Sequence, residues 1–359
     1  MKYQYWLANI QGLSNRTIRK MLQYAGSAEE IYFLKKEQLQ KLGDIRPEQT
    51  QAILESKRTW DLEKESEILK EKGIAFVTCE SERFPETLRN IVDPPYGLYV
   101  KGKFLSAEKR TAAIIGARMC SEYGRAMAEE LGKQLALHGV TIISGMARGI
   151  DAYGHLGAVK AKGETYAVLG CGVDICYPES NRRLYEQIPQ NGGVLSEYPP
   201  GQKPEPWHFP ARNRIMSALS DVVIIVEAKE RSGSLITADF ALEQGKDVYA
   251  VPGRVGDSLS KGCNYLIKQG AGIISDVEDF LKDLELCDIH KEFQENFNKF
   301  LLEKDESLVY SCVDLLPKSI EELIEQTGLT CQKLADILQS LVHKELIRES
   351  FKNFYIRVN

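Results

Sequence analysis

One short stretch of this 359-residue chain combines glycine, arginine and an acidic residue directly after an apolar run. The run 140–143 stops at residues 144–151, with the sequence SGMARGID, and a helical pattern follows. Where a strand leads through such a loop into a helix, the free N–H groups and the dipole of the helix N-terminus favour an anion. A second loop of this kind, GAR at residues 116–118, follows the apolar run 111–115. Two such loops predict a ligand that carries phosphate.

Apolar runs alternate with helical patterns on both sides of these loops. The runs lie at 111–115, 140–143, 165–169, 194–196, 222–226, 248–251 and 272–274, and helical patterns between most of them include 123–137, 152–161, 181–188 and 235–244. Strands that are apolar on both faces and alternate with helices predict a parallel sheet covered on both sides. We therefore expect a Rossmann-like, doubly wound, mostly parallel sheet, which binds its ligand at the carboxyl ends of the strands.

Smaller units flank this sheet, so the chain is predicted to be a multidomain α/β protein. Helical patterns at 13–24, 28–34, 36–42 and 47–69 predict a small N-terminal helical domain, similar to SAM or helix-hairpin-helix modules, over 1–70. Strand patterns at 74–78 and 96–100 extend the Rossmann-like domain to 71–286, and a polar linker follows at 287–306. Helical patterns at 307–315, 319–326 and 331–343, followed by alternating apolar residues, predict a C-terminal winged helix over 307–359.

The composition is that of an ordinary soluble globular protein. Hydrophobic residues make up 43% of the chain and charged residues 27%, and the net charge is -5. No global basic field therefore marks a nucleic-acid binder, although a local cleft can be basic on an acidic protein. The eight cysteines include no C-x-x-C pair, and the five histidines are not spaced as metal ligands beside them. We expect a cytoplasmic protein with free thiols, no metal and no membrane segment.

The other strand ends also carry polar residues, and parallel strands would bring these loops together. On this basis Arg118, Arg148, Arg212 and Ser234 could line one cleft, while Arg214 is a candidate for a structural role. Each loop also has a simpler interpretation, because glycines serve tight turns and a single arginine is usually solvated or paired. The fingerprints of dinucleotide-binding sites, P-loops, nucleophile elbows and zinc proteases are missing from the sequence.

Carboxylates are the remaining candidates for catalysis. Asp151 and His155 lie one helical turn apart and could form an acid–base pair. The simpler interpretation, which we prefer, makes Asp151 a helix N-cap and His155 a packed or solvated side chain. Glu227, at a strand end, could be catalytic or could pair with Arg212.

Taken in order, the loop motifs resemble the DNA-processing protein A (DprA/Smf) family. They are IIGAR at 114–118, SGMARGID at 144–151, LSEYPPG at 195–201, FPARNR at 209–214, EA at 227–228 with SGSLIT at 232–237, and AVPG at 250–253. The resemblance implies a non-catalytic, cofactor-free, homodimeric protein that binds single-stranded DNA. It also implies that the protein protects incoming strands and helps load the RecA recombinase in natural transformation.

The resemblance also implies which residues bind DNA. Arg118 matches the arginine that the family uses for DNA, and Phe209 is a candidate for stacking on a base. The full set of expected DNA-binding residues is Gly116, Ala117, Arg118, Gly145, Arg148, Phe209, Arg212, Asn213, Ser232, Ser234 and Thr237. This chain has Ala117 where many members have serine. It has Glu179 where some members carry a DNA-binding lysine, with Arg182 and Arg183 placed to substitute.

An enzymatic function is the alternative that the sequence leaves open. The sheet and the SGSLIT loop are similar to those of phosphoribohydrolases, enzymes that cleave the base from a nucleoside monophosphate. That family expects a PGGxGT loop and a glutamate on the next helix, and Glu243 lies too far along to match.

The C-terminal tail is acidic. Residues 305–359 hold 6 basic and 9 acidic residues, a net charge of -3. This charge predicts that the winged helix binds protein rather than DNA.

Overall fold

Nine strands form the central sheet of the computed structural model, which describes residues 1–41, 45–286, 304–314, 316–344 and 346–358. The strand order is β1-β2-β6-β5-β4-β3-β7-β8-β9. Strands β1 and β2 pair antiparallel, as do β2 and β6, and the other neighbours are parallel. The strands are β1 (Ile74–Thr78), β2 (Gly97–Gly102), β3 (Thr111–Ile115), β4 (Thr141–Ser144), β5 (Thr165–Val168), β6 (Gly193–Ser196), β7 (Val222–Ile225), β8 (Asp247–Ala250) and β9 (Gly272–Ile273). The prediction of a Rossmann-like, mostly parallel sheet is confirmed.

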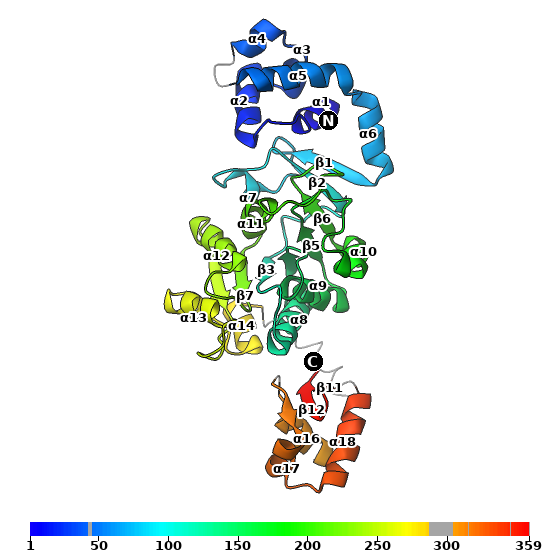
Figure 1. The fold of residues 1–359 in the computed structure, drawn as a ribbon, viewed down its shortest axis with the longest axis vertical. Helices are drawn as coiled ribbons and strands as arrows, with labels where there is room; N and C mark the ends of the chain where they lie inside the picture. Colours follow the sequence, from blue (N-terminus) through cyan, green and yellow to red (C-terminus); the bar gives the residue numbers. More distant parts are fainter. Residues whose placement is uncertain (42–44, 287–303, 315, 345, 359) are drawn as a thin grey trace.

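Helices cover both faces of this sheet because successive strand residues point to opposite sides. In β3, Ala113 and Ile115 pack into a core with α11, α12 and α13, whereas Ala112 and Ile114 pack into a second core with α8, α9 and α14. Figure 1 shows these helices around the strands in the middle of the molecule. The helices of this part are α7 (Glu86–Arg89), α8 (Glu122–Leu137), α9 (Ile150–Lys160), α10 (Arg182–Asn191), α11 (His208–Ala218), α12 (Gly233–Glu243), α13 (Lys261–Lys268) and α14 (Val277–Asp283).

Helices α8 and α9 pack unusually close together through glycines. A Cβ atom added to Gly157 in α9 would lie 2.1 Å from the carbonyl oxygen of Glu129 in α8. A Cβ atom added to Gly132 in α8 would lie 2.2 Å from the carbonyl oxygen of Gly154 in α9. The two backbones touch only because these side chains are missing, and this contact fixes α9, whose first turn adjoins the loop 144–149.

Six helices form the N-terminal module, of which two were predicted as one helix and one was not predicted. The pattern 47–69 is two helices rather than one, because Trp60 adopts an extended backbone and Asp61 caps a new helix by accepting hydrogen bonds from the N–H groups of Glu63 and Lys64. The first helix, α1, was not predicted, although it buries Trp6 in the core of the module. The helices are α1 (Lys2–Ala8), α2 (Asn15–Ala25), α3 (Ala28–Phe33), α4 (Lys36–Gln40), α5 (Pro47–Thr59) and α6 (Leu62–Glu71).

The segment FPARNR at 209–214, which was grouped with the loop motifs in the sequence, lies on a helix and not in a loop. Helix α11 begins at His208, so Arg212, Asn213 and Arg214 lie on a helix. Pro210 is the third residue of α11, within the first turn, where the N–H group that proline lacks would have no partner inside the helix. Three consecutive polar residues therefore point in different directions around one helix.

The C-terminal unit contains three helices and a three-stranded antiparallel sheet in the order β10-β12-β11. Its elements are α16 (Lys304–Cys312), β10 (Lys318–Ser319), α17 (Ile320–Thr327), α18 (Cys331–His343), β11 (Ile347–Phe351) and β12 (Phe354–Arg357). The name winged helix stays a prediction, as do the domain boundaries. Most of the predicted linker, residues 287–303, lies outside the described residues. Within the described ranges, no helix is both long enough and apolar enough to cross a bilayer.

Candidate functional site

A cavity of about 290 Å³ lies where the loops after β3 and β4 meet the first turns of α11 and α12. Eight of the eleven expected site residues line it: Gly116, Arg118, Phe209, Arg212, Asn213, Ser232, Ser234 and Thr237. Ala117 is buried beside it, and Gly145 packs against the guanidinium of Arg212. Arg148 is exposed and does not line the cavity. The sheet thus brings most of the expected residues together, but some are exposed and others are buried with partners inside the protein.

The mouth of this cavity carries an exposed cation next to two aromatic rings. The guanidinium carbon of Arg118 lies 5.3 Å from the ring centroid of Phe209. The ring of Tyr177 stacks on the same phenylalanine, with centroids 5.5 Å apart and planes inclined by 30°. Arg118 is exposed. A cation held beside aromatic rings in this way can meet a phosphate while the rings meet an apolar or aromatic group.

The N-terminus of α12 opens onto the cavity with polar groups that are not fully used inside the protein. Ser232 is the N-cap, and its Oγ accepts from the N–H of Ser234 at 3.4 Å and lies 2.7 Å from the Ser234 hydroxyl oxygen. The hydroxyl of Thr237 is buried and has no hydrogen-bond partner among the described residues. No atom lies within 4 Å of the place where a Cβ on Gly233 would sit. A helix dipole and an unpaired buried hydroxyl both favour a polar, anionic ligand here.

The N-terminus of α9, the first anion site that the sequence predicted, is occupied by the protein itself. Asp151 lies in the first turn of α9 and is 3% exposed. Burial raises the pKa of Asp151. The charge of Arg212 and hydrogen bonds from the backbone N–H groups of Ala147, Gly116 and Gly145 oppose this rise. N–H groups of both glycine loops therefore act on an internal carboxylate.

Arg212 is a buried bracing residue and not an exposed cation. Arg212 is 4% exposed, and its guanidinium donates to the carbonyl oxygens of Gly145, at 2.8 Å, and Val168, and to Asn213 Oδ1 at 3.2 Å. These bonds join the ends of β4 and β5 to α11. The charge of Asp151 favours the protonated form of Arg212, so these two buried groups stabilise each other.

The acid–base pair considered for Asp151 and His155 does not form. His155 is fully buried, and its Nδ1 lies 2.6 Å from the hydroxyl oxygen of Thr165. Burial lowers the pKa of His155 to about 3, which keeps this ring neutral. The N-cap of α9 is Gly149, so Asp151 is not the cap. His155 is therefore a packed side chain, as the simpler interpretation predicted.

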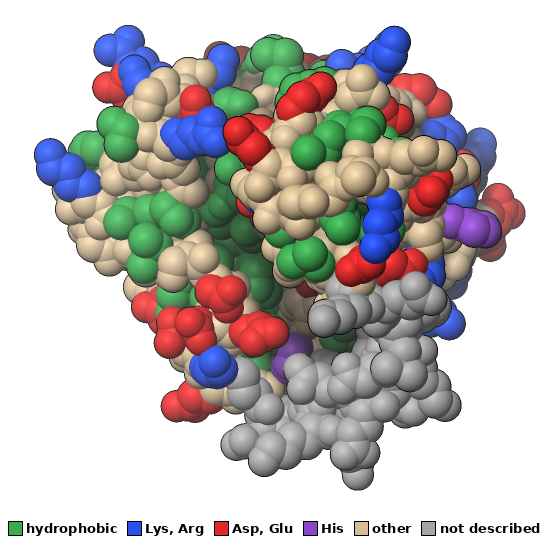
Figure 2. Space-filling model, turned by 90° about the horizontal axis from the view of Figure 1, so that it is seen from below, with side chains coloured by type: hydrophobic (Ala, Val, Ile, Leu, Met, Phe, Trp, Pro, Cys, Tyr) green, Lys and Arg blue, Asp and Glu red, His purple; other side chains and the backbone are tan. Residues whose placement is uncertain are grey.

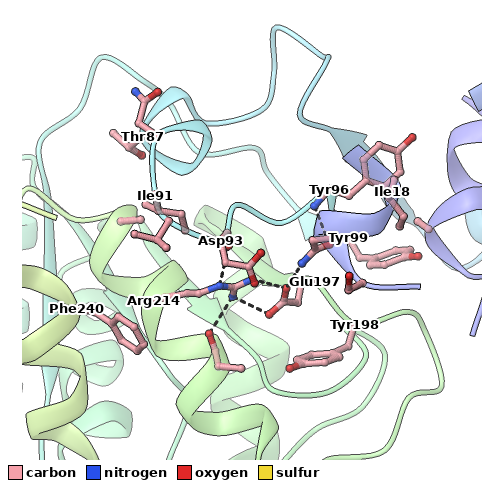
Figure 3. A pocket seen from close by; sticks show the side chains of 18 of the residues that line it. Ile18, Thr87, Ile91, Asp93, Tyr96, Tyr99, Glu197, Tyr198, Arg214 and Phe240 are labelled. Carbon is pink, nitrogen blue, oxygen red and sulfur yellow. Dashed lines mark hydrogen bonds and ion pairs between the residues drawn. The ribbon is translucent and has the colours of Figure 1, made fainter. Parts of the chain in front are cut away.

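Glu227 and Arg214 both have partners that assign them structural roles. Glu227 accepts from the N–H of Ser121 at 2.9 Å and from its hydroxyl at 2.5 Å, at the start of α8, and does not pair with Arg212. Arg214 donates to both carboxylate oxygens of Glu197 at 2.8 Å and to the carbonyl oxygen of Asp93 at 2.9 Å. The guanidinium of Arg214 faces a larger pocket, of about 870 Å³, shown in Figure 3 between the N-terminal module and helices α11 and α12.

The loop after β5 contains a residue that the sequence interpretation did not single out. Tyr177 stacks on Phe209 beside the cavity, whereas the sequence interpretation of this segment singled out Glu179. After this loop, Glu179 forms an exposed ion pair with Arg182 at 2.6 Å. Arg182 was expected to replace a DNA-binding lysine, and this ion pair partly neutralises its charge. Arg183 is exposed.

Known proteins match this chain over the sheet and the site. The family profile described as DNA recombination-mediator protein A matches residues 75–285, more than half of the chain. DNA processing protein DprA of Streptococcus pneumoniae is 36% identical over 284 residues, which are 79% of this chain and 98% of that protein. DNA processing protein DprA of Bacillus subtilis is 43% identical over 216 residues, 60% of this chain and 73% of that protein.

Solved structures agree with these matches. The X-ray structure of DNA processing protein A from Streptococcus pneumoniae superposes with a TM-score of 0.68 at 35% identity, covering 79% of this chain and 97% of that one. The structure of DNA processing protein A from Helicobacter pylori gives 0.53 at 33% identity, covering 58% of this chain and 95% of that one. The chain belongs to the DNA recombination-mediator protein A family.

Proposed function

We propose that this protein binds single-stranded DNA at the cavity mouth and acts as a recombination mediator in the cytoplasm. In this role it protects incoming strands and helps load the RecA recombinase during natural transformation. The observation that carries the proposal is the pairing of exposed Arg118 and Phe209 with the open N-terminus of α12. The Helicobacter pylori relative, which was solved for its single-stranded DNA binding mode, supports the choice of ligand. Phosphate contacts combined with base stacking give sequence-tolerant binding.

The same cavity argues for binding without catalysis. Among the described residues that line it, Asp151 is the carboxylate, and it is buried and engaged by Arg212 and by backbone N–H groups. Glu243, which the phosphoribohydrolase alternative would need, lines the larger pocket on the other side of α11. A general base must reach the substrate within hydrogen-bond distance. We therefore propose a binding protein and expect no release of free base from nucleoside monophosphates.

Changing Arg118 to alanine should weaken single-stranded DNA binding for every sequence. Arg118 is the exposed cation at the cavity mouth, and each neutralised phosphate contributes a slope of roughly -0.7 to the dependence of log K on log salt for a single strand. We expect a loss of roughly tenfold in affinity at low salt and a shallower salt dependence. Fluorescence anisotropy with labelled single- and double-stranded oligonucleotides at several salt concentrations measures both.

Two control variants locate this effect. Arg148→Ala removes an exposed arginine that does not line the cavity and should change the affinity much less. A chain that ends at residue 286 should keep its single-strand affinity, because we propose that the acidic C-terminal unit binds protein. Figure 2 shows the molecule from the end that carries the C-terminal unit, and acidic and basic side chains are interspersed on this face. Unchanged binding by Arg118→Ala would reject the proposed site, and weak binding by the shortened chain would reject the role given to the tail.

We also propose that two copies associate through the β9 edge of the sheet. At this edge Ile273 is 50% exposed, and Tyr265 of α13 and Leu242 of α12 are 57% and 59% exposed. An open edge strand with apolar neighbours is a ready pairing surface. Light scattering after size exclusion should give about twice the chain mass of 40.5 kDa.

The double variant Tyr265→Glu, Ile273→Lys should be a folded monomer. Tyr24→Glu serves as a matched control, because Tyr24 is similarly exposed, at 61%, but lies in the N-terminal module. A wild-type monomer at micromolar concentration, or a double variant that stays dimeric, would place the contact elsewhere.

A further inference from the structure

The ring of Phe209 is already engaged on several sides in the free protein. Arg118 lies over it, Tyr177 stacks on it, and a Cβ added to Gly170 would come within 3.1 Å of its Cδ1. Phe209 is only partly exposed, whereas Tyr177 is 42% exposed. Tyr177 does not line the cavity itself, but it offers the larger free aromatic surface next to the lining residue Phe209.

Tyr177 is held in place by its neighbours in the chain. Cys176 is buried, and its thiol contacts the carbonyl oxygen of Pro178 at 3.5 Å, which also accepts from the N–H of Asn181 at 3.0 Å. The side chain of Asn181 donates to the carbonyl oxygen of Met146 at 2.9 Å, in the glycine loop after β4. An aromatic ring that is ordered before binding loses little conformational entropy when a ligand covers it.

We infer that Tyr177 is a base-stacking residue of this site, with Phe209 as the ring that supports it. The inference rests on the proposed binding of single-stranded DNA and names the residue that would contact a nucleobase. Arg118 and the α12 N-terminus offer partners for phosphate, and Tyr177 offers a flat apolar face beside them. Stacking on an aromatic face does not depend on base identity, which suits a protein that handles strands of any sequence.

A second exposed aromatic residue near the cavity is less well placed. Trp207 is 62% exposed, but its indole N–H donates to the carboxylate of Glu205 at 2.6 Å, and its ring is edge-on to His208. A carboxylate bound to the ring edge disfavours an approaching DNA strand, which is itself anionic. Trp207 is therefore the matched comparison for Tyr177.

The test separates base contacts from phosphate contacts by using two ligands with the full-length protein. One is a labelled thymidine oligonucleotide, and the other has the same length and backbone but abasic sites throughout. We expect the wild type to bind the thymidine strand roughly tenfold more tightly than the abasic strand. Tyr177→Leu should lose roughly that factor on the thymidine strand and bind the abasic strand as the wild type does. Tyr177→Phe keeps the ring and should behave as the wild type.

The outcomes distinguish this inference from the proposed function. Retained binding of the abasic strand by Tyr177→Leu shows that the variant is folded and that its phosphate contacts are intact. The inference fails if Tyr177→Leu binds the thymidine strand normally while Arg118→Ala does not. It also fails if Trp207→Leu, and not Tyr177→Leu, loses the preference for bases. If the wild type binds neither strand, the proposed function itself is wrong.

Discussion

Replacing Arg212 with leucine will lower the free energy of unfolding by about 3–5 kcal/mol. Arg212 is 4% exposed, its charge interacts with that of buried Asp151, and its guanidinium donates to the carbonyl oxygens at the ends of β4 and β5. Without it, a buried carboxylate and two carbonyl groups lose their partner, and an uncompensated buried charge is among the most destabilising changes known. Urea unfolding followed by circular dichroism measures the change.

Two further variants test the reason for this loss. Arg148→Leu removes the exposed arginine of the adjacent loop and should change the free energy of unfolding by less than about 0.5 kcal/mol. Combining Arg212→Leu with Asp151→Asn should recover part of the stability, because the amide oxygen still accepts backbone hydrogen bonds but no charge is buried. A double variant that is less stable than Arg212→Leu alone would show that the ionic explanation is wrong. DNA affinities of Arg212 variants are interpretable only where these proteins are folded.

Adding one methyl group at Gly157 should destabilise the fold by about 2–3 kcal/mol. The new Cβ would lie 2.1 Å from the carbonyl oxygen of Glu129 and 2.7 Å from the backbone nitrogen of Lys133. Both are backbone atoms of α8, so the two helices must separate. Alanine is favoured over glycine inside a helix by about 1 kcal/mol, and the steric overlap outweighs that gain. Thermal and urea unfolding of Gly157→Ala measure the net effect.

Gly233 provides the matched control for this substitution. It lies in the first turn of α12, and no atom lies within 4 Å of its added Cβ. Gly233→Ala should leave the stability unchanged or raise it by up to about 1 kcal/mol. Equal losses at Gly157 and Gly233 would mean that the contact between α8 and α9 is softer than the structure indicates.

The order of layers could be predicted from the sequence because hydrophobic burial is written into consecutive residues. Four of the five residues in the run TAAII at 111–115 are apolar, and all five are buried in the sheet between two layers of helices. The glycine loops at the ends of β3 and β4 followed from the same pattern. The arrangement of Arg118, Phe209 and the SGSLIT loop around one cavity confirms that these strand ends converge.

The use of individual polar groups could not be predicted, because it depends on contacts between distant segments. Nothing in SGMARGID shows that Asp151 accepts from loop N–H groups and faces Arg212, some sixty residues away. The glycines of α8 and α9 look like helix weakeners in the sequence, and only the packed helices show that they are contact points. Likewise, the motif FPARNR was grouped with the loops, and only the structure shows that it lies on α11 with Pro210 in the first turn.

Three adjacent residues of helix α11 contact three different parts of the molecule. Arg212 braces the strand ends, Asn213 lines the proposed DNA cavity and also donates to the carbonyl oxygen of Gly233, and Arg214 forms an ion pair with Glu197 in the larger pocket. Figure 3 shows Arg214 beneath the loop that carries Asp93 and Tyr96. A mutation that shifts or rotates this helix therefore alters the bracing of the strand ends, the lining of the cavity and the ion pair with Glu197 together. Evolution of new ligand preferences in this protein should proceed more readily through Tyr177 and Arg118, whose side chains are exposed, than through this helix.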